Sequence, residues 1–378
     1  MNGSSPIKQA ENAGRTVFID VDPLAEKHLT GIGRYTARLA LALARETRGG
    51  VRFFSRDQEV IAPANLDWSQ DQDLGRWGRA VWRGRRQPLS GIPEASLAIH
   101  GCLRTNERRF PFEVSVLHDF TPLIVPWTHA EKTVRQFQEF FNRDLLASDA
   151  AIAVSKSTKA DAAWLCGFDP NRIVVAPSGP SLCVEGHLDE SPAERLPHVG
   201  LVVSTLEPRK NAYFLLDWFR ETDTLGDGAE LWWAGPLGWL TSRRKLRRYQ
   251  GLKGRKIRFL GVVSDAALCR LYRQAGWSAY PSLYEGFGFP VLDALRHGTP
   301  VVASYHSALC ELDHPGVHFF DPFDQSTLDH AFQSLRHARD PLIAASTLDS
   351  LYNWNHVARA ILNLKMKLGG EPQASIAA

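Results

Sequence analysis

The chain has few cysteines, and none lies in a pairing or metal-binding pattern. Its 378 residues include five cysteines, an odd number with no Cys-x-x-Cys spacing: Cys102, Cys166, Cys183, Cys269 and Cys310. Such a set argues against a disulfide framework and against a zinc site, and it fits a reducing compartment.

Long apolar runs are also absent. No apolar stretch approaches the roughly 20 residues that a transmembrane helix needs. Residues 9–14 are polar, and no apolar core of a secretory signal is present near the start. These absences predict a cytoplasmic protein, with peripheral contact at the cytoplasmic face of the inner membrane as a further expectation.

The sequence carries no large excess of one charge. Lys and Arg total 44 against 41 Asp and Glu, a formal net charge of +3. That balance gives no support to a nucleic-acid partner. One local run, residues 76–86, is basic and contains Arg76, Arg79, Arg83, Arg85 and Arg86 interleaved with Trp77 and Trp82. It fits a solvated loop, or a contact with an anionic acceptor or a membrane surface.

Short apolar runs alternate with helical patterns in both halves of the chain. The strands expected in the first half are 16–21, 97–100, 114–117 and 151–154, and the helices are 35–44 and 131–146. A polar segment rich in Gly and Pro, 178–198, is expected to be a linker. The second half then shows strands at 200–204, 230–234, 257–260, 277–281 and 300–303, with helices at 265–275, 289–297 and 346–368.

This alternation predicts an α/β protein with two Rossmann-like, doubly wound domains facing a central cleft. Because 378 residues exceed one ordinary core, two domains are also the natural division by length. We expect residues 15–185 to form an N-terminal domain and 198–345 a C-terminal domain. A helical tail, 346–378, is expected to pack back on the first domain.

The segment PSLYEGFGFPVLDA, residues 281–294, is the most informative part of the sequence. A strand ends, a glycine-bearing loop follows, and a helix begins near Pro290, where proline suits the first turn. Gly286 and Gly288 lack a Cβ, so backbone amides there can approach a ligand closely. The helix N-terminus favours a phosphate. Glu285 in the loop and Asp293 one helical turn later are both expected to face that ligand.

Two further segments follow strands and carry polar groups. STLEPRKN, residues 204–211, ends in Arg209 and Lys210, whose charges at the mouth of a nucleotide cleft would neutralise a diphosphate. In the first half, GIGRY, residues 31–35, precedes a helix, and His118 follows a strand.

Together these segments resemble the retaining GT-B glycosyltransferases of family 4, which include many mannosyltransferases. The resemblance covers the chain from Val17 to about Trp354, and it is weak at residues 51–96, where acceptor-specific loops are expected. It implies that Glu285 contacts the transferred sugar, that Gly286, Phe287 and Gly288 hold that sugar by their backbone, and that Asp293 binds the ribose. The family more often has Glu at the position of Asp293 and glycine at the position of Ser204.

The resemblance also assigns the remaining site residues. Catalytic roles fall to Glu285, His118, Lys210 and Arg209, and donor binding is shared by Ser204 and Gly33 with the loop residues and Asp293. Gly31, Arg34 and Tyr35 are expected on the acceptor side, and we place Arg83 there as well. The resemblance predicts no metal and no cofactor other than a nucleotide-sugar co-substrate, for which GDP-mannose is the first choice. The acceptor would be a polysaccharide or a lipid-linked oligosaccharide.

Two motifs invite other interpretations. Asp20-Val21-Asp22 is a DxD sequence, which binds manganese in a different glycosyltransferase fold, but here it closes the first strand. GIGRYT resembles part of the dinucleotide fingerprint GxGxxG, with Thr36 in place of the third glycine. An NAD-dependent oxidoreductase is therefore a remote alternative. A non-catalytic nucleotide-sugar-binding subunit of the same fold is a second, because fold alone does not determine function.

Overall fold

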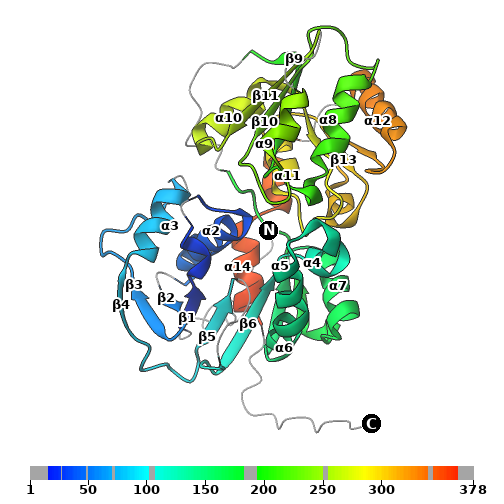
Figure 1. The fold of residues 1–378 in the computed structure, drawn as a ribbon. Helices are drawn as coiled ribbons and strands as arrows, with labels where there is room; N and C mark the ends of the chain where they lie inside the picture. Colours follow the sequence, from blue (N-terminus) through cyan, green and yellow to red (C-terminus); the bar gives the residue numbers. More distant parts are fainter. Residues whose placement is uncertain are drawn as a thin grey trace, which may run out of the picture.

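The protein contains two α/β units stacked one above the other (Figure 1). The computed structural model describes residues 16–26, 28–47, 50–69, 73–101, 107–182, 194–249, 254–338 and 344–364. Each unit is built on its own sheet, and helices cover both sheets. The predicted α/β, GT-B architecture is therefore confirmed.

The first sheet has the strand order β4-β3-β2-β1-β5-β6-β7-β8. Its strands are β1 (Val17–Asp20), β2 (Val51–Ser55), β3 (Gln58–Ile61), β4 (Arg85–Pro88), β5 (Leu97–His100), β6 (Phe112–Leu117), β7 (Ala150–Ala153) and β8 (Ile173–Val175). Pairing is parallel from β2 through β8, while β3 and β4 extend the edge in antiparallel fashion. The parallel strands bring their carboxyl ends to one edge.

Helix α2 (Gly31–Glu46) crosses this sheet and is buried on nearly every side. Thr30 caps it, because its hydroxyl accepts a hydrogen bond from the Gly33 amide. A helix that is buried all round needs a partner on its second face. That partner is α14 (Trp354–Leu362), from the far end of the chain. The two helices lie side by side in Figure 1.

The longer helices that remain in the first unit follow β3, β6 and β7. They are α3 (Leu74–Trp82), α4 (Thr121–Ile124), η2 (Pro126–Thr128), α5 (Glu131–Gln136), the π-turn Phe137–Phe141, α6 (Asn142–Leu146) and α7 (Lys156–Cys166), and the short turns η1 (Asp22–Leu24) and η4 (Pro170–Arg172) flank them. The predicted helix over 131–146 thus contains a π-helical turn. Gly167 ends α7 in a left-handed conformation with φ +64°, which glycine adopts without strain.

The second sheet has the order β11-β10-β9-β12-β13-β14, with every pair parallel. Its strands are β9 (Leu196–Val203), β10 (Glu230–Ala234), β11 (Lys256–Gly261), β12 (Ala275–Tyr280), β13 (Val301–Ser304) and β14 (Val317–Phe320). Its helices are η6 (Pro208–Lys210), α8 (Ala212–Glu221), α9 (Arg243–Leu246), η7 (Arg247–Tyr249), α10 (Asp265–Gln274), α11 (Phe289–Arg296), η8 (Ser307–Leu312) and α12 (Gln325–His337). The strand order reverses direction between β9 and β12, which is where doubly wound sheets bind ligands.

The chain end returns to the first unit through α13 (Ala345–Leu351) and α14. Val357, Ala358 and Ile361 are fully buried where α14 meets α2, and Arg359 pairs with Glu46 on α2 at 3.0 Å. None of the helices within the described ranges has the length and apolar character needed to cross a bilayer.

The element boundaries differ from expectation in several places. The tail expected as one helix over 346–368 forms two, α13 (Ala345–Leu351) and α14, and residues 365–378 lie outside the described part of the chain. The GIGRY segment does not precede a helix, because α2 already begins at Gly31. Strand β9 begins at Leu196, so the expected linker ends earlier, and most of that segment lies outside the described residues. The basic run at 76–86 is not a loop, because it forms most of α3 and the start of β4. Strands β2, β3, β4 and β14 were not expected.

Candidate active site

A buried cluster of two carboxylates and two cationic side chains lies where β9 and β12 end. Glu285 follows β12, and η6 presents Arg209 and Lys210 after β9. The Oε1 atom of Glu285 lies 2.6 Å from Lys210 Nζ, and Oε2 lies 2.9 Å from Arg209 Nη1. Arg209 Nη2 also pairs with Glu207 Oε1 at 3.0 Å. Glu285 therefore contacts both of the other sequence-predicted residues directly.

Electrostatics keep this cluster ionised. Burial opposes ionisation of Glu285, yet Arg209 and Lys210 lower its pKa to about 2. Burial likewise works against the charges on Arg209 and Lys210, but the neighbouring carboxylates raise the pKa of both. Two cations and two carboxylates balance, so the cluster is close to electrically neutral without a ligand.

Donors beside the cluster remain unused. Within the described residues, Arg209 Nε and Ser204 Oγ are buried and have no hydrogen-bond partner. Buried polar atoms are normally paired, so unpaired donors at a strand end suit a ligand rich in oxygen atoms. Ser204 occupies the position where the resembling family has glycine, and its hydroxyl adds one such donor.

Two members of the cluster were not predicted as site residues. Glu207 is buried, and burial raises its pKa although Arg209 and Lys210 oppose this shift. The Tyr280 hydroxyl accepts a hydrogen bond from Lys210 Nζ at 3.0 Å. Glu207 stands in the STLEPRKN segment, so its position could have identified it. Tyr280 ends a buried strand, and no pattern distinguishes it from a core tyrosine.

The glycine loop is also shaped by the first domain. A Cβ on Gly286 would lie 1.6 Å from the His118 carbonyl oxygen, so the two domains touch through backbone at this point. The hydroxyl of Thr158 reaches both the His118 and the Gly286 carbonyls, at 3.4 and 3.3 Å. Gly288 begins α11 with φ +115°, a conformation open to glycine alone. Both glycines are thus required by packing and conformation.

His118 lies at the end of β6 with its ring partly buried. Its Nε2 is 2.8 Å from the Gly101 carbonyl, which can only accept, so Nε2 carries the hydrogen. Burial lowers the pKa of His118, and the ring is neutral at neutral pH. Its Nδ1 then holds a lone pair that can accept a hydrogen bond from a hydroxyl.

The amino end of α2 faces the second domain. A Cβ on Gly31 would lie 3.9 Å from the Phe289 ring at the start of α11. Arg34 forms a two-pronged ion pair with Asp265, the first residue of α10, at 3.0 and 2.5 Å. Gly33 is enclosed, because a Cβ there would lie 2.8 Å from the Pro23 carbonyl. This turn therefore joins the two domains directly.

Three predicted site residues are placed differently from the rest. The Tyr35 ring is completely buried, with its edge on His118 at 4.9 Å and on Trp354 at 5.0 Å. The Phe287 side chain packs against Phe289 and Tyr352, so only its backbone is open to a ligand. Arg83 ends α3 and is exposed, on a helix that packs against α2 and the β3 edge.

The carboxylate of Asp293 is already occupied in this conformation. It accepts hydrogen bonds from the Ser181 hydroxyl, from the Ser181 amide at 3.2 Å and from the Leu182 amide at 3.3 Å. The side chain is buried, and burial raises its pKa. Asp293 therefore attaches α11 to the segment that follows β8. A ribose could reach it only if these bonds opened.

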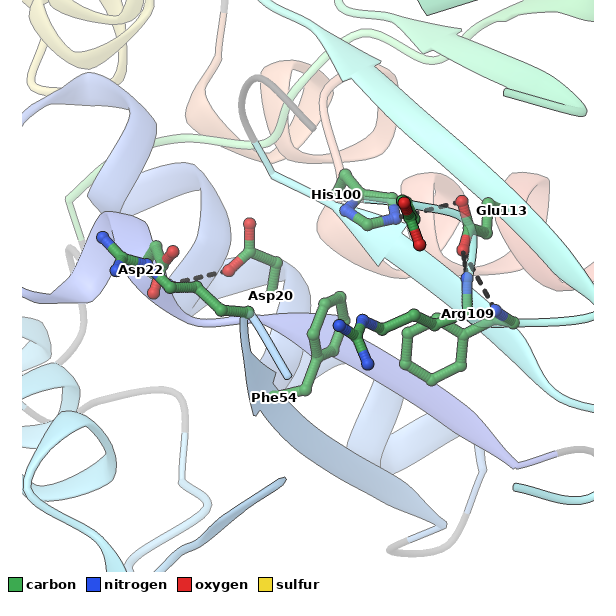
Figure 2. A pocket seen from close by; sticks show the side chains of 9 residues that line it. Asp20, Asp22, Phe54, His100, Arg109 and Glu113 are labelled. Atoms are coloured by element: carbon green, nitrogen blue, oxygen red, sulfur yellow. Dashed lines mark hydrogen bonds and ion pairs between the residues drawn. The ribbon is translucent and has the colours of Figure 1, made fainter. Parts of the chain in front are cut away.

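The DxD pair lies in a small polar pocket of the first domain (Figure 2). Asp20, Asp22, His100, Arg109 and Glu113 all line it. The cavity holds about 10 Å³, which is room for a single water at most. Burial, and then the charge of Asp22, raise the pKa of Asp20 to about 7.

The carboxylates of this pocket accept hydrogen bonds from backbone amides of neighbouring residues. Asp20 accepts the Asp22 amide at 2.9 Å, and Glu113 accepts the Arg109 amide at 2.8 Å. No group of three or more His, Cys, Asp or Glu side chains in the described ranges is arranged to hold a metal ion.

Comparisons with known proteins agree with this arrangement. Residues 197–336 match the family model described as "Glycosyl transferases group 1". The chain is 29% identical over 342 residues to the O-antigen chain mannosyltransferase B of Escherichia coli, which covers 82% of this chain and 87% of that protein.

Solved structures share the fold. A sucrose-phosphate synthase from Thermosynechococcus elongatus superposes with a TM-score of 0.62 at 17% identity, covering 91% of this chain and 96% of that one. HepE of Anabaena in complex with UDP-glucose superposes with a TM-score of 0.58 at 16% identity, covering 92% of this chain and 98% of that one. At these identities the likeness establishes the architecture.

Proposed function

We propose that the chain is a GT-B glycosyltransferase of the mannosyltransferase-like group, and that it transfers mannose from GDP-mannose with retention of configuration. The observation that carries the proposal is the buried cluster of Glu285, Arg209 and Lys210 at the carboxyl ends of β9 and β12. In doubly wound sheets this is the ligand-binding position.

In the proposed reaction the second domain holds the donor. The diphosphate lies against Arg209 and Lys210, and Arg209 Nε and Ser204 Oγ become paired with its oxygens. Glu285 and the neutral His118 orient the sugar. The bond between the sugar C1 and the phosphate oxygen breaks, and the diphosphate leaves with its charge stabilised by the two cations.

The acceptor hydroxyl then attacks C1 from the side that the diphosphate has left. A new bond forms between C1 and the acceptor oxygen, and the hydroxyl proton passes to a departing phosphate oxygen. Because the two cations already stabilise the leaving group, the proposed mechanism needs no metal ion.

The choice of sugar rests on the relatives. The Escherichia coli relative is named an O-antigen chain mannosyltransferase, so we assign mannose as the transferred sugar and a growing polysaccharide or lipid-linked oligosaccharide as the acceptor. The first domain, with Gly31, Arg34 and Arg83, is assigned to the acceptor side. We propose that the reaction takes place in the cytoplasm, since the cysteine pattern fits a reducing compartment.

A donor screen tests this function. Thermal unfolding of the full chain would be measured with GDP-mannose, UDP-glucose and dTDP-sugars, and we expect GDP-mannose to raise the melting temperature most. Transfer to a mannose-containing oligosaccharide would then be followed by release of GDP, and the anomeric configuration would be read by NMR. Stronger stabilisation by a UDP-sugar would overturn the donor assignment, and an inverted product would overturn retention. Donor binding without GDP release would make the protein a binding subunit.

A further inference from the structure

Exposed apolar side chains gather on two segments that meet across the domains. Trp127 of η2 is 68% exposed, and the loop after β10 carries Leu237, Trp239 and Leu240 at 39%, 40% and 60%. The Trp239 indole donates a hydrogen bond to the Thr128 carbonyl at 2.8 Å, which joins the two segments. We call these four side chains the apolar rim. Single exposed apolar residues need no explanation, but a group of four large ones does.

A basic segment follows the rim directly in the chain. It comprises α9 and η7, in which Leu246 and Tyr249 are buried and the side chains of Arg244, Lys245, Arg247 and Arg248 are exposed. In the part of the chain that the structure describes, none of these four forms an ion pair with a carboxylate. The positive charges therefore face outward beside the rim.

The rim adjoins the candidate active site. The Gly238 amide bonds to the Leu206 carbonyl at 2.9 Å, and a Cβ on Gly238 would lie 3.1 Å from Glu207 Cβ. His129 stacks on Trp239 with ring centroids 5.8 Å apart, and its pKa is lowered by burial and then by the charge of Arg209. Anything that covers the rim thus lies at the edge of the Arg209–Glu285 cluster.

We propose that the apolar rim and the basic segment form a docking surface for an anionic lipid bilayer. Tryptophan and leucine insert at the boundary between headgroups and acyl chains, while arginine and lysine attract acidic headgroups. A soluble polyanion would pair with the basic segment but leave the apolar rim exposed to water. A two-fold dimer through this face would bring like charges together or leave the basic segment outside the interface. An anionic bilayer can bury the rim and pair with the basic segment at the same time.

The inference rests on the proposed function only in that a lipid-linked acceptor would then be presented beside the donor. Flotation of the full chain with lipid vesicles tests it, with neither donor nor acceptor present, so a negative result leaves the donor assignment intact. Vesicles of phosphatidylcholine alone would be compared with vesicles containing about one third phosphatidylglycerol, at low and high salt. We expect binding to the anionic vesicles, weakened by salt.

Two variants separate the components. Arg247→Gln combined with Arg248→Gln should weaken partitioning about 30-fold, since each charge near an acidic surface contributes about a fivefold factor. Trp127→Ser combined with Leu240→Asn should weaken it about tenfold or more, because two large side chains no longer insert. Leu240 has φ +55°, which asparagine tolerates, so this change should not disturb folding. Thermal unfolding verifies that both variants are folded.

Matched controls use the same residue types elsewhere. Trp164 on α7 is 88% exposed, so Trp164→Ser removes an equally exposed tryptophan. Arg85→Gln combined with Arg86→Gln removes two exposed charges from the other basic run, at residues with no assigned role in the site. Both controls should partition like the wild type. The proposal is wrong if the wild type ignores anionic vesicles, or if a control loses as much binding as its matched variant. It is equally wrong if a soluble anionic polysaccharide binds as tightly as vesicles and the Trp127/Leu240 variant is unaffected.

Discussion

Replacing Glu285 by glutamine should separate donor binding from transfer. In the wild type, Arg209 and Lys210 are balanced by Glu207 and Glu285, all four of them largely buried. Glutamine keeps the shape and removes one negative charge, so the cluster gains a net charge of about +1. The variant therefore has an excess cation where the diphosphate would lie.

The charge change has three consequences of different sign. Leaving a buried cation without its partner should lower the free energy of unfolding by about 3–5 kcal/mol. Transfer should fall at least about 100-fold, because an electrostatic group at the reacting sugar is lost. Free nucleoside diphosphate should nevertheless bind more tightly. A unit charge about 6 Å from a phosphate contributes roughly 3 kcal/mol at an effective dielectric constant near 20, or about 10- to 100-fold after salt screening.

Calorimetry with GDP and thermal unfolding in its absence measure these effects. Because the pKa of Glu285 is lowered to about 2 from an ordinary value near 4.5, its stabilising effect is complete above pH 4.5 and is lost as the pH falls towards 2. The variant's stability deficit should follow the same course. Glu230→Gln is a suitable control, since it breaks an exposed pair with Arg258 and should change stability by less than about 1 kcal/mol. Weaker GDP binding by a folded Glu285→Gln protein would refute the charge argument.

Three further outcomes are expected. Arg209→Ala and Lys210→Ala should each weaken GDP binding about 10- to 100-fold, with the larger loss for Lys210→Ala, while the affinity for bare guanosine stays unchanged. Calorimetry with both ligands measures this. If both variants bound GDP as tightly as the wild type, the donor site would have to lie elsewhere. Transfer should continue in the presence of EDTA, because the two cations stabilise the leaving group. If EDTA abolished transfer and manganese restored it, a metal-binding role for Asp20 and Asp22 would be supported instead. Asp20→Asn should stabilise the protein by up to about 4 kcal/mol at pH 8 and hardly at pH 4. The folded-state pKa of Asp20 is raised to about 7, so the cost of ionising this buried carboxyl grows as the pH rises. Equal melting shifts at both pH values would contradict this.

The apolar rim with its basic segment and the basic run at 76–86 both combine tryptophan with arginine. The sequence pattern indicated only the run at 76–86. In the structure, the Trp77 side chain of α3 is buried in the core, and Arg86 lies over the Trp82 ring at 4.4 Å. The rim combines residues from two distant segments, and composition within one window does not detect such a combination.

Local sequence patterns were sufficient to predict the architecture and the strand ends that carry polar groups. Apolar runs alternating with helical periods identified most strands of the two sheets, and the motifs located Glu285, Arg209 and Lys210 at loops after β12 and β9. These properties are local, because strand, turn and helix signals act over a few neighbouring residues. They also imply which loops share an edge, since parallel strands align their carboxyl ends.

The contacts that form across the two domains could not be predicted from these local patterns. The His118 carbonyl occupies the place of a Cβ at Gly286, Ser181 holds the Asp293 carboxylate, and Tyr35 lies in the core. The first two of these contacts depend on how two separately patterned domains are placed against each other, and the burial of Tyr35 depends on the return of α14 to the first domain, where Trp354 contacts its ring. That placement is set by side-chain packing between residues more than 100 positions apart in the chain, and no local periodicity encodes it.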